Sequence, residues 1–163
     1  MIEMTRLKVN CIHTTPDLLI RILNSLPNLD SLTIFELPSH DEIYECIDDE
    51  NQINKFLKNN KISKLTLRNI PNLDDISTIV HFFPRLQYFG IEAINDLEFP
   101  LVVESVLSMI KTNTYFHPKI LCIFDGEVAH DTVEKLKQLI DAKYLLKNYA
   151  IHRRLDRFYF QWK

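Results

Sequence analysis

Six short segments of the chain repeat one spacing of apolar residues, in which the first, fourth and sixth positions are apolar. The segments are 4–9, 29–34, 62–67, 86–91, 118–123 and 155–160, with Pro118 as the exception at a first position. Because the fourth and sixth positions are two residues apart, the pattern predicts strands with one apolar and one polar face. Four segments add an apolar residue three positions later, at Ile12, Leu37, Ile70 and Ile94.

Between these strands the apolar residues recur at helical spacing. Helices are predicted over residues 16–25, 39–58, 74–83, 100–111 and 131–147. Thr15 before Pro16 has the pattern of an N-cap followed by proline at the first helical position. Ser39-x-x-Glu42 and Asp131-x-x-Glu134 have the spacing of capping boxes. The alternation of strand and helix predicts an α/β chain with a parallel sheet of about six strands.

Two architectures fit this alternation. A doubly wound sheet, the fold of many enzymes, has near-continuous apolar strands and a glycine-bearing turn after its first strand. A repeat solenoid instead has strands that are apolar on one side. The chain holds two glycines, Gly90 and Gly126, where average usage would give roughly eleven. The one-sided strands and the scarce glycines favour the solenoid, and the scarcity also disfavours glycine-rich phosphate-binding loops.

The strand segments carry a resemblance to a known family. The chain resembles a leucine-rich repeat array, through Leu29-Asp30-Ser31-Leu32-Thr33-Ile34, Ile62-Ser63-Lys64-Leu65-Thr66-Leu67 and Leu86-Gln87-Tyr88-Phe89-Gly90-Ile91. The lead-ins resemble the helix-to-strand turns of the repeats that follow F-boxes, at Leu26-Pro27-Asn28-Leu29 and Phe83-Pro84-Arg85-Leu86. The resemblance implies a curved solenoid with helices on the convex side and substrate recognition for an F-box ubiquitin ligase. Ligase components would then bind through further N-terminal sequence.

Two departures from the family pattern are visible. The ninth repeat position, Asn or Cys in the family, holds Ile12, Leu37, Ile70 and Ile94, so no asparagine ladder is expected. Because about three residues precede the first predicted strand, we expect no F-box within residues 1–163. We expect residues 1–163 to form a single domain that is a fragment of a longer array, because repeat arrays protect their ends and this chain ends at Trp162 and Lys163 without a cap.

The composition is that of a globular protein with a mild charge. Nineteen lysines and arginines oppose 22 acidic residues, a net charge of −3, so neither nucleic acid nor a membrane is expected as a partner. No apolar run approaches the roughly eighteen residues that cross a bilayer. Cys11, Cys46 and Cys122 form no C-x-x-C pair, and no secretion signal is recognisable. We therefore expect a cytoplasmic or nuclear protein with reduced thiols.

No combination of residues predicts catalysis. Cys122 lies between Leu121 and Ile123, so alternation places it on the face opposite the core, where we interpret it as a tolerated surface cysteine rather than a nucleophile. Asp125-Gly126-Glu127 has two carboxylates after an apolar strand but lacks the Gly-Thr that follows in aspartate-nucleophile phosphatases. We expect a protein that is not an enzyme and uses no cofactor.

Metal binding is not predicted either. The histidines have no metal-ligand spacing, although three could lie near one rim, namely His13, His40 and His130. The acidic stretch 41–50 lacks the loop glycine and residue order of a calcium site. It is interpreted as a solvated helix surface.

The tail of the chain, residues 147–163, combines basic and aromatic residues. The set is Lys147, Tyr149, Arg153, Arg154, Arg157, Phe158, Tyr159, Trp162 and Lys163. Such a mixture is typical of RNA contacts, which is one alternative function. The net charge of the chain favours the other interpretation, a terminal strand with a charged outer edge.

The outward face of the strands is the predicted functional site. Large aromatics occupy outward positions where solvation would favour small polar residues, at Phe35, Tyr88, Phe124 and Tyr159. Aromatic residues and arginine are enriched at the cores of protein interfaces. We predict binding of a protein partner on this concave face, with Arg68 between Phe35 and Tyr88. The predicted binding residues are Phe35, Lys64, Arg68, Tyr88, Glu92, Phe124, Arg157 and Tyr159.

Overall fold

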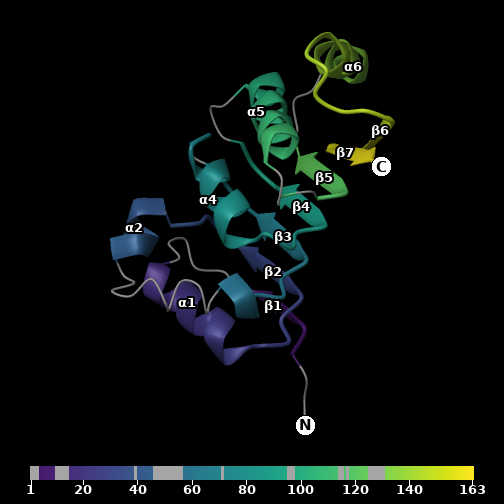
Figure 1. Ribbon diagram of the computed structural model, residues 1–163. Coiled ribbons are helices and arrows are strands. Elements are labelled where there is room, and N and C mark those ends of the chain that lie inside the picture. Colours follow the sequence, from purple (N-terminus) through teal and green to yellow (C-terminus); the bar gives the residue numbers. More distant parts are fainter. Residues whose placement is uncertain are drawn as a thin grey trace.

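The computed structural model describes residues 4–9, 15–38, 40–45, 57–70, 72–94, 98–113, 116, 118–124 and 131–163. These residues form an α/β domain with a seven-stranded, mostly parallel sheet (Figure 1). The strands are β1 (Arg6–Lys8), β2 (Ser31–Ile34), β3 (Lys64–Leu67), β4 (Tyr88–Ile91), β5 (Ile120–Phe124), β6 (Tyr149–Arg154) and β7 (Arg157–Trp162). The helices are α1 (Pro16–Ser25), α2 (His40–Glu45), α4 (Asp75–Phe82), α5 (Phe99–Thr112) and α6 (Thr132–Ala142).

The first five strands are parallel and lie in sequence order. They pair without any shift of the repeated spacing, so that Leu32, Leu65, Phe89 and Leu121 are neighbours across the sheet. The order then changes to β5-β7-β6, and both of these last pairings are antiparallel.

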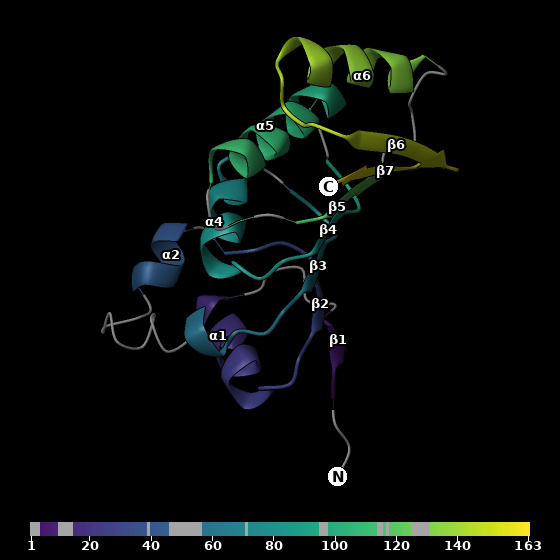
Figure 2. The same ribbon diagram turned by 45° about the vertical axis from the view of Figure 1, so that its right-hand side comes forward.

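The described helices lie along one face of the sheet (Figures 1 and 2). A doubly wound sheet would carry helices on both faces, whereas the described helices cover one face. The core lies between the sheet and this helical layer, where the fourth and sixth positions of the repeated spacing are buried in β2 to β5 and β7. The predicted burial of the fourth and sixth positions is therefore confirmed in these strands.

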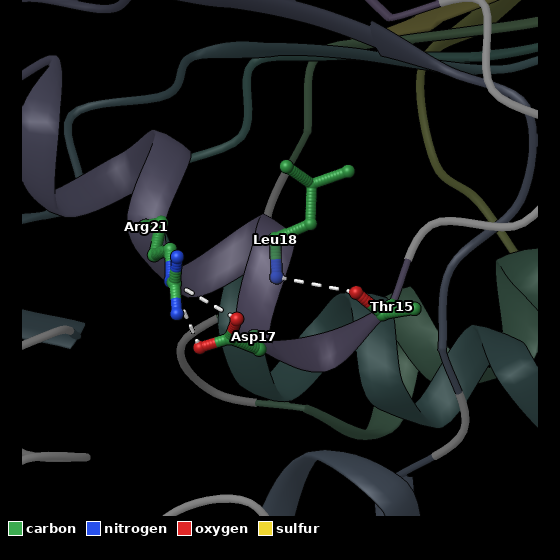
Figure 3. Close-up of polar contacts among 4 residues, drawn as sticks. All are labelled: Thr15, Asp17, Leu18 and Arg21. Carbon is green, nitrogen blue, oxygen red and sulfur yellow. Dashed lines mark hydrogen bonds and ion pairs between the residues drawn. The ribbon is translucent and has the colours of Figure 1, made fainter.

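Helix α1 begins as its sequence predicts. The Thr15 side chain accepts a hydrogen bond from the backbone N–H of Leu18 at 3.3 Å, and Pro16 takes the first helical position (Figure 3). This N-cap satisfies one of the backbone donors that a helix leaves unpaired at its start. One turn further on, Arg21 Nε lies 3.0 Å from an Asp17 carboxylate oxygen on the exposed side of the helix.

The other helices differ from their predicted bounds at the ends. Helix α4 and helix α5 fall within one residue of the predictions, whereas α6 ends at Ala142 rather than at residue 147. The Asp131 side chain does not cap α6. It pairs instead with Lys135 at 2.7 Å, and this hydrogen bond holds the pKa of the Asp131 carboxyl below its usual value. Of the helix predicted over residues 39–58, the structure describes α2 and a helical segment at 57–59.

Each strand from β2 to β5 begins with the same backbone arrangement. Two consecutive N–H groups donate to a single carbonyl of the preceding strand segment, and the four accepting carbonyls belong to Thr5, Asp30, Ser63 and Gln87. The Ser63 hydroxyl also donates to the Asp30 carboxylate. The recurrence of this arrangement keeps the first five strands in register.

The prediction of six parallel strands is wrong at the C-terminal end of the sheet. The segment 155–160 does supply a strand, β7, but it runs antiparallel to β5. Its predecessor β6 was not predicted at all, and Leu155, expected in the core, is 90% exposed in the turn between the two strands. The cause is local, because a two-residue connection permits an antiparallel hairpin, whereas a parallel strand needs a crossover of a dozen residues or more. The structure supports the α/β class, and beyond that class a repeat solenoid is not evident.

Candidate functional site

The face of the sheet opposite the helices carries the predicted site. We call it the open face and define it by the strand residues that alternate with the buried ones and by the residue directly after β2, β3 and β4. Its members are Arg6, Lys8, Ser31, Thr33, Phe35, Lys64, Thr66, Arg68, Tyr88, Gly90, Glu92, Ile120, Cys122, Phe124, Ala150, His152, Arg154, Arg157, Tyr159 and Gln161.

The position of the Tyr88 ring on this face is fixed by its neighbours. Its ring lies against Gly90, two residues further along β4, since a Cβ added to Gly90 would sit 3.0 Å from Tyr88 Cε1 and 3.1 Å from Thr66 Oγ1. Any larger side chain at position 90 would occupy the space that the ring fills. Glycine in the middle of a strand commonly marks such a close approach.

Cys122 lies at the far end of the Tyr88 ring, on the neighbouring strand. It pairs in register with Gly90 on one side and with Tyr159 on the other. Burial raises the pKa of the Tyr88 phenol above its usual value, and a side-chain hydrogen bond with Cys122 raises it further. The prediction of a surface thiol is wrong in exposure, because Cys122 is 3% exposed. Its face was predicted correctly, but the neighbouring rings cover it.

Arg157 stands beside this group at the start of β7. Burial acts to lower the pKa of its guanidinium, but the Coulombic effect of Cys122 and Tyr159 outweighs burial and leaves the pKa raised. The side chain is therefore a permanent cation at the edge of the Tyr88–Cys122 contact. Phe124 pairs in register with Arg157 and is half-buried.

A cavity of about 670 Å³ opens next to these residues. Its lining from the open face includes four residues of β4, β5 and β7 and two of the outermost strand, β6. They are Tyr88, Ile120, Tyr159 and Gln161, with His152 and Arg154 of β6. Val133 of α6 and the helix-facing residues Ile151 and Arg153 also line it. The cavity thus involves residues from both faces of the outer strand. Of these β6 residues, Arg153 and Arg154 were predicted as part of the basic and aromatic tail, whereas Ile151 and His152 were missed because β6 was not predicted.

Three other predicted residues gather at the ends of β2, β3 and β4. Arg68 Nε lies 3.3 Å from a Glu92 carboxylate oxygen, and its guanidinium lies 6.0 Å from the centre of the Phe35 ring. With Asn69 and Ala93 they line a second cavity, of about 350 Å³. Asn69 is buried and donates from Nδ2 to Glu36 at 3.1 Å.

The predicted order along the open face needs one correction. Arg68 does not separate Phe35 from Tyr88. The register places Lys64 beside Tyr88, four residues before Arg68, so the tyrosine belongs to another row of side chains. The predicted residues therefore form two groups, one around Tyr88, Tyr159 and Arg157 and the other around Arg68, with exposed Lys64 between Ser31 and Tyr88.

Charge is distributed unevenly between the open face and the whole chain. The described open face carries six cationic side chains and one carboxylate, that of Glu92. The cations are Arg6, Lys8, Lys64, Arg68, Arg154 and Arg157. The whole chain has a net charge of −3. The open face is therefore basic, although the protein as a whole is acidic.

Several predicted features lie outside the described residues. These are Cys11, Ile12, His13, Ser39, Cys46, Asp125-Gly126-Glu127, His130 and most of the acidic stretch. Within the part that is described, no three His, Cys, Asp or Glu side chains are grouped as metal ligands. No helix in that part is long and apolar enough to span a membrane. A scan of family models and searches of curated proteins and of solved structures gave no match to the chain.

Proposed function

We propose that this protein is an interaction module whose open face binds an acidic segment of a partner protein. The uneven charge of the molecule carries the proposal, because a face with six cations and one carboxylate on a protein of net charge −3 is a local, oriented feature. Complementary charge steers association and selects among partners. General attraction to polyanions would instead call for a basic protein overall.

The aromatic residues supply the second part of the argument. Tyr88 and Tyr159 line the 670 Å³ cavity beside Arg154, so apolar and cationic surface occur together. Tyrosine and arginine are the residue types that most often dominate binding energy at protein interfaces. The Tyr88 ring is also held in place by Gly90 and Cys122, which lowers the entropy that it loses when a partner binds.

We further propose that the first five strands form leucine-rich-repeat-like units and that the protein is not an enzyme. The recurring carbonyl arrangement at Thr5, Asp30, Ser63 and Gln87 supports the repeat assignment, as does the sequential order of these strands. Recognition of substrates for a ubiquitin ligase is the cellular role that the resemblance implies.

Reversal of charge on the open face tests the proposal. Lys64→Glu with Arg157→Glu should abolish affinity capture of acidic proteins from cell extract. Lys58→Glu with Arg85→Glu changes the net charge equally at exposed residues away from this face and should leave capture intact. Equal loss in both double variants would contradict the proposal. Capture that disappears after nuclease treatment would point to RNA as the ligand instead.

A further inference from the structure

The 670 Å³ cavity has more apolar wall than the acidic side chains of the proposed partner can use. Five of its described lining residues are aromatic or aliphatic, namely Tyr88, Ile120, Val133, Ile151 and Tyr159. Its volume is that of sites that enclose whole apolar groups. A carboxylate loses free energy when it leaves water for such a surface. The wall therefore calls for a second, apolar group on the same partner.

Two opposed arginines stand at one end of the open face. Arg154 lines the cavity, and Arg157 is its register partner across the β6–β7 hairpin; both are exposed. Like charges directly opposite one another destabilise an antiparallel pair, so an anion between the two guanidinium groups would offset a cost that the free protein carries. The described lining contains no carboxylate, and Asp156, in the turn between the strands, is not part of it.

The third arginine of this region is engaged elsewhere. Arg153 also lines the cavity, but its Nε donates to the Leu155 carbonyl at 3.2 Å. Its guanidinium lies 5.3 Å from the centre of the Phe158 ring. We therefore assign it no ligand contact, and the charge of the site comes from the opposed arginine pair.

The apolar wall and the arginine pair are separated along the strands. Tyr88 pairs in register with Ile120 at the start of β5, whereas Arg157 pairs with Phe124 at its end. These positions are four residues apart, which is roughly 14 Å at the usual rise of a strand. Tyr159 lies midway between them. One side chain does not reach both ends, but an extended peptide covers this distance in about four residues.

We infer that the cavity is the anchor site for the partner's acidic segment and takes an aromatic side chain that lies about four residues from a pair of carboxylates. The aromatic ring packs against Tyr88, Ile120 and Tyr159, since aromatic pairs gain free energy beyond the area that they bury. The carboxylates lie over Arg154 and Arg157, because a guanidinium holds a carboxylate through two parallel hydrogen bonds. The inference rests on the proposed function and adds the motif that the open face recognises.

The test measures binding of short acetylated, amidated peptides to the intact protein by calorimetry. The first peptide has tryptophan, a Gly-Ser-Gly spacer and two glutamates, and it is made in both chain directions. The tighter of the two should bind about tenfold more strongly than a peptide with tryptophan directly beside the glutamates, because only the spaced one reaches both ends. Leucine in place of tryptophan should also weaken binding about tenfold. Glutamines in place of the glutamates should abolish it.

Substitutions in the protein locate the two ends of the motif. Arg154→Gln should weaken the spaced peptide about tenfold, whereas Arg85→Gln, at an exposed residue away from the open face, should leave it unchanged. Tyr159→Leu keeps an apolar wall but removes an aromatic partner, so it should reduce the preference for tryptophan over leucine to about threefold or less. Should that variant fail to fold, Tyr88→Leu makes the same test.

The outcomes separate this inference from the proposed function. Equal binding of the tryptophan and leucine peptides, equal binding of the spaced and adjacent peptides, or no binding of any of them overturns the anchor site. An unchanged affinity of Arg154→Gln does so too. If Lys64→Glu with Arg157→Glu still abolishes capture of acidic proteins, the open-face function stands without the anchor. Displacement of the peptide by oligouridylate would make RNA the ligand and would overturn both.

Discussion

The Tyr88 ring lies over Gly90 and fills the space that a side chain at position 90 would need. We predict that Gly90→Ala destabilises the fold by about 1 kcal/mol, since displacement of a packed ring outweighs the lost backbone freedom of glycine. In a Tyr88→Ala background the same substitution should be neutral or stabilising. Urea unfolding of the four proteins measures both effects. An equal cost in the two backgrounds would show that the ring is not the obstacle.

Tyr88 also controls access to Cys122. In a protein carrying Cys11→Ser and Cys46→Ser, we expect the remaining thiol to react slowly with a disulfide reagent, because Cys122 is buried beside the Tyr88 hydroxyl. Tyr88→Ala should raise the labelling rate about tenfold or more by removing that cover. Tyr144→Ala is the control, as Tyr144 is exposed and is not near the thiol in sequence or strand register. Rapid labelling of the Cys11→Ser, Cys46→Ser protein with Tyr88 intact would contradict the burial of Cys122.

The sequence predicts well which strand residues face the helices. It predicts less well the exposure of the opposite face and the direction of the last strand. Apolar residues such as Leu65 and Phe89 must leave water, and their spacing therefore fixes which side of each strand faces the helices. The exposure of Cys122 could not be predicted in this way, because it depends on a ring from a neighbouring strand. The direction of β7 depends on the turn at Leu155, which the repeated spacing instead assigns to a strand.

The candidate site is predictable to the same extent. Alternation places Arg68, Glu92 and Tyr88 on one face; in the structure Arg68 contacts Glu92, and Tyr88 pairs with Lys64, which also lies on that face. It does not by itself predict that Arg68 pairs with Glu92, because that contact also requires the register in which Leu67 and Ile91, the residues just before them, are partners. Spacing along one chain predicts a face, whereas contacts between side chains also require the register between strands.

Asn60 joins the end of α4 to the start of β3. Its Nδ2 donates to the Phe82 carbonyl at 2.7 Å, and its Oδ1 accepts from the Ile62 backbone N–H at 3.0 Å. We predict that Asn60→Ala lowers the free energy of unfolding by about 2 kcal/mol, because two backbone groups lose their partners in a buried place. Asn60→Asp keeps the acceptor for Ile62 and should be less damaging than Asn60→Ala at a pH where the carboxyl is neutral. Denaturant unfolding gives both values, and an unchanged midpoint for the alanine variant would contradict this role.

We predict that titration of Tyr149 lowers the free energy of unfolding in alkaline solution. Burial raises the pKa of its phenol from 10.0 to about 12, and the hydrogen bond that it donates to Asp141 at 2.7 Å adds to the effect. Above pH 10 the unfolded chain loses this proton while the folded chain keeps it, so the free energy of unfolding falls as the pH rises from 10 towards 12. The stabilisation is complete below pH 10.

Two variants isolate this contribution from that of Tyr88, whose pKa is also raised. Tyr149→Phe should flatten the decline of unfolding free energy across this range, because no phenol remains to titrate at that position. Asp141→Asn should flatten it partly, since burial of the ring persists. If the phenylalanine variant follows the same pH dependence as the unaltered protein, Tyr149 does not titrate as described.

Leu155 is an apolar residue in the least suitable place in the hairpin. It has a φ of 53° in the two-residue turn and is 90% exposed. A left-handed conformation costs a side chain with a Cβ roughly 1–2 kcal/mol, and asparagine tolerates it better than other residues that carry one. Because the side chain packs against almost nothing, its removal forfeits little burial. We therefore predict that Leu155→Asn raises the free energy of unfolding by about 1 kcal/mol.

Three substitutions at Leu155 should follow a definite order of stability. Leu155→Gly should also stabilise the protein, but less than asparagine, because glycine adds freedom to the unfolded chain. Leu155→Val should destabilise it, since a β-branched side chain fits a positive φ least well. Thermal unfolding ranks all four proteins, with asparagine expected highest, followed by glycine, leucine and valine. A lower melting temperature for Leu155→Asn than for the unaltered protein would mean that the turn gains more from leucine than it loses in backbone strain.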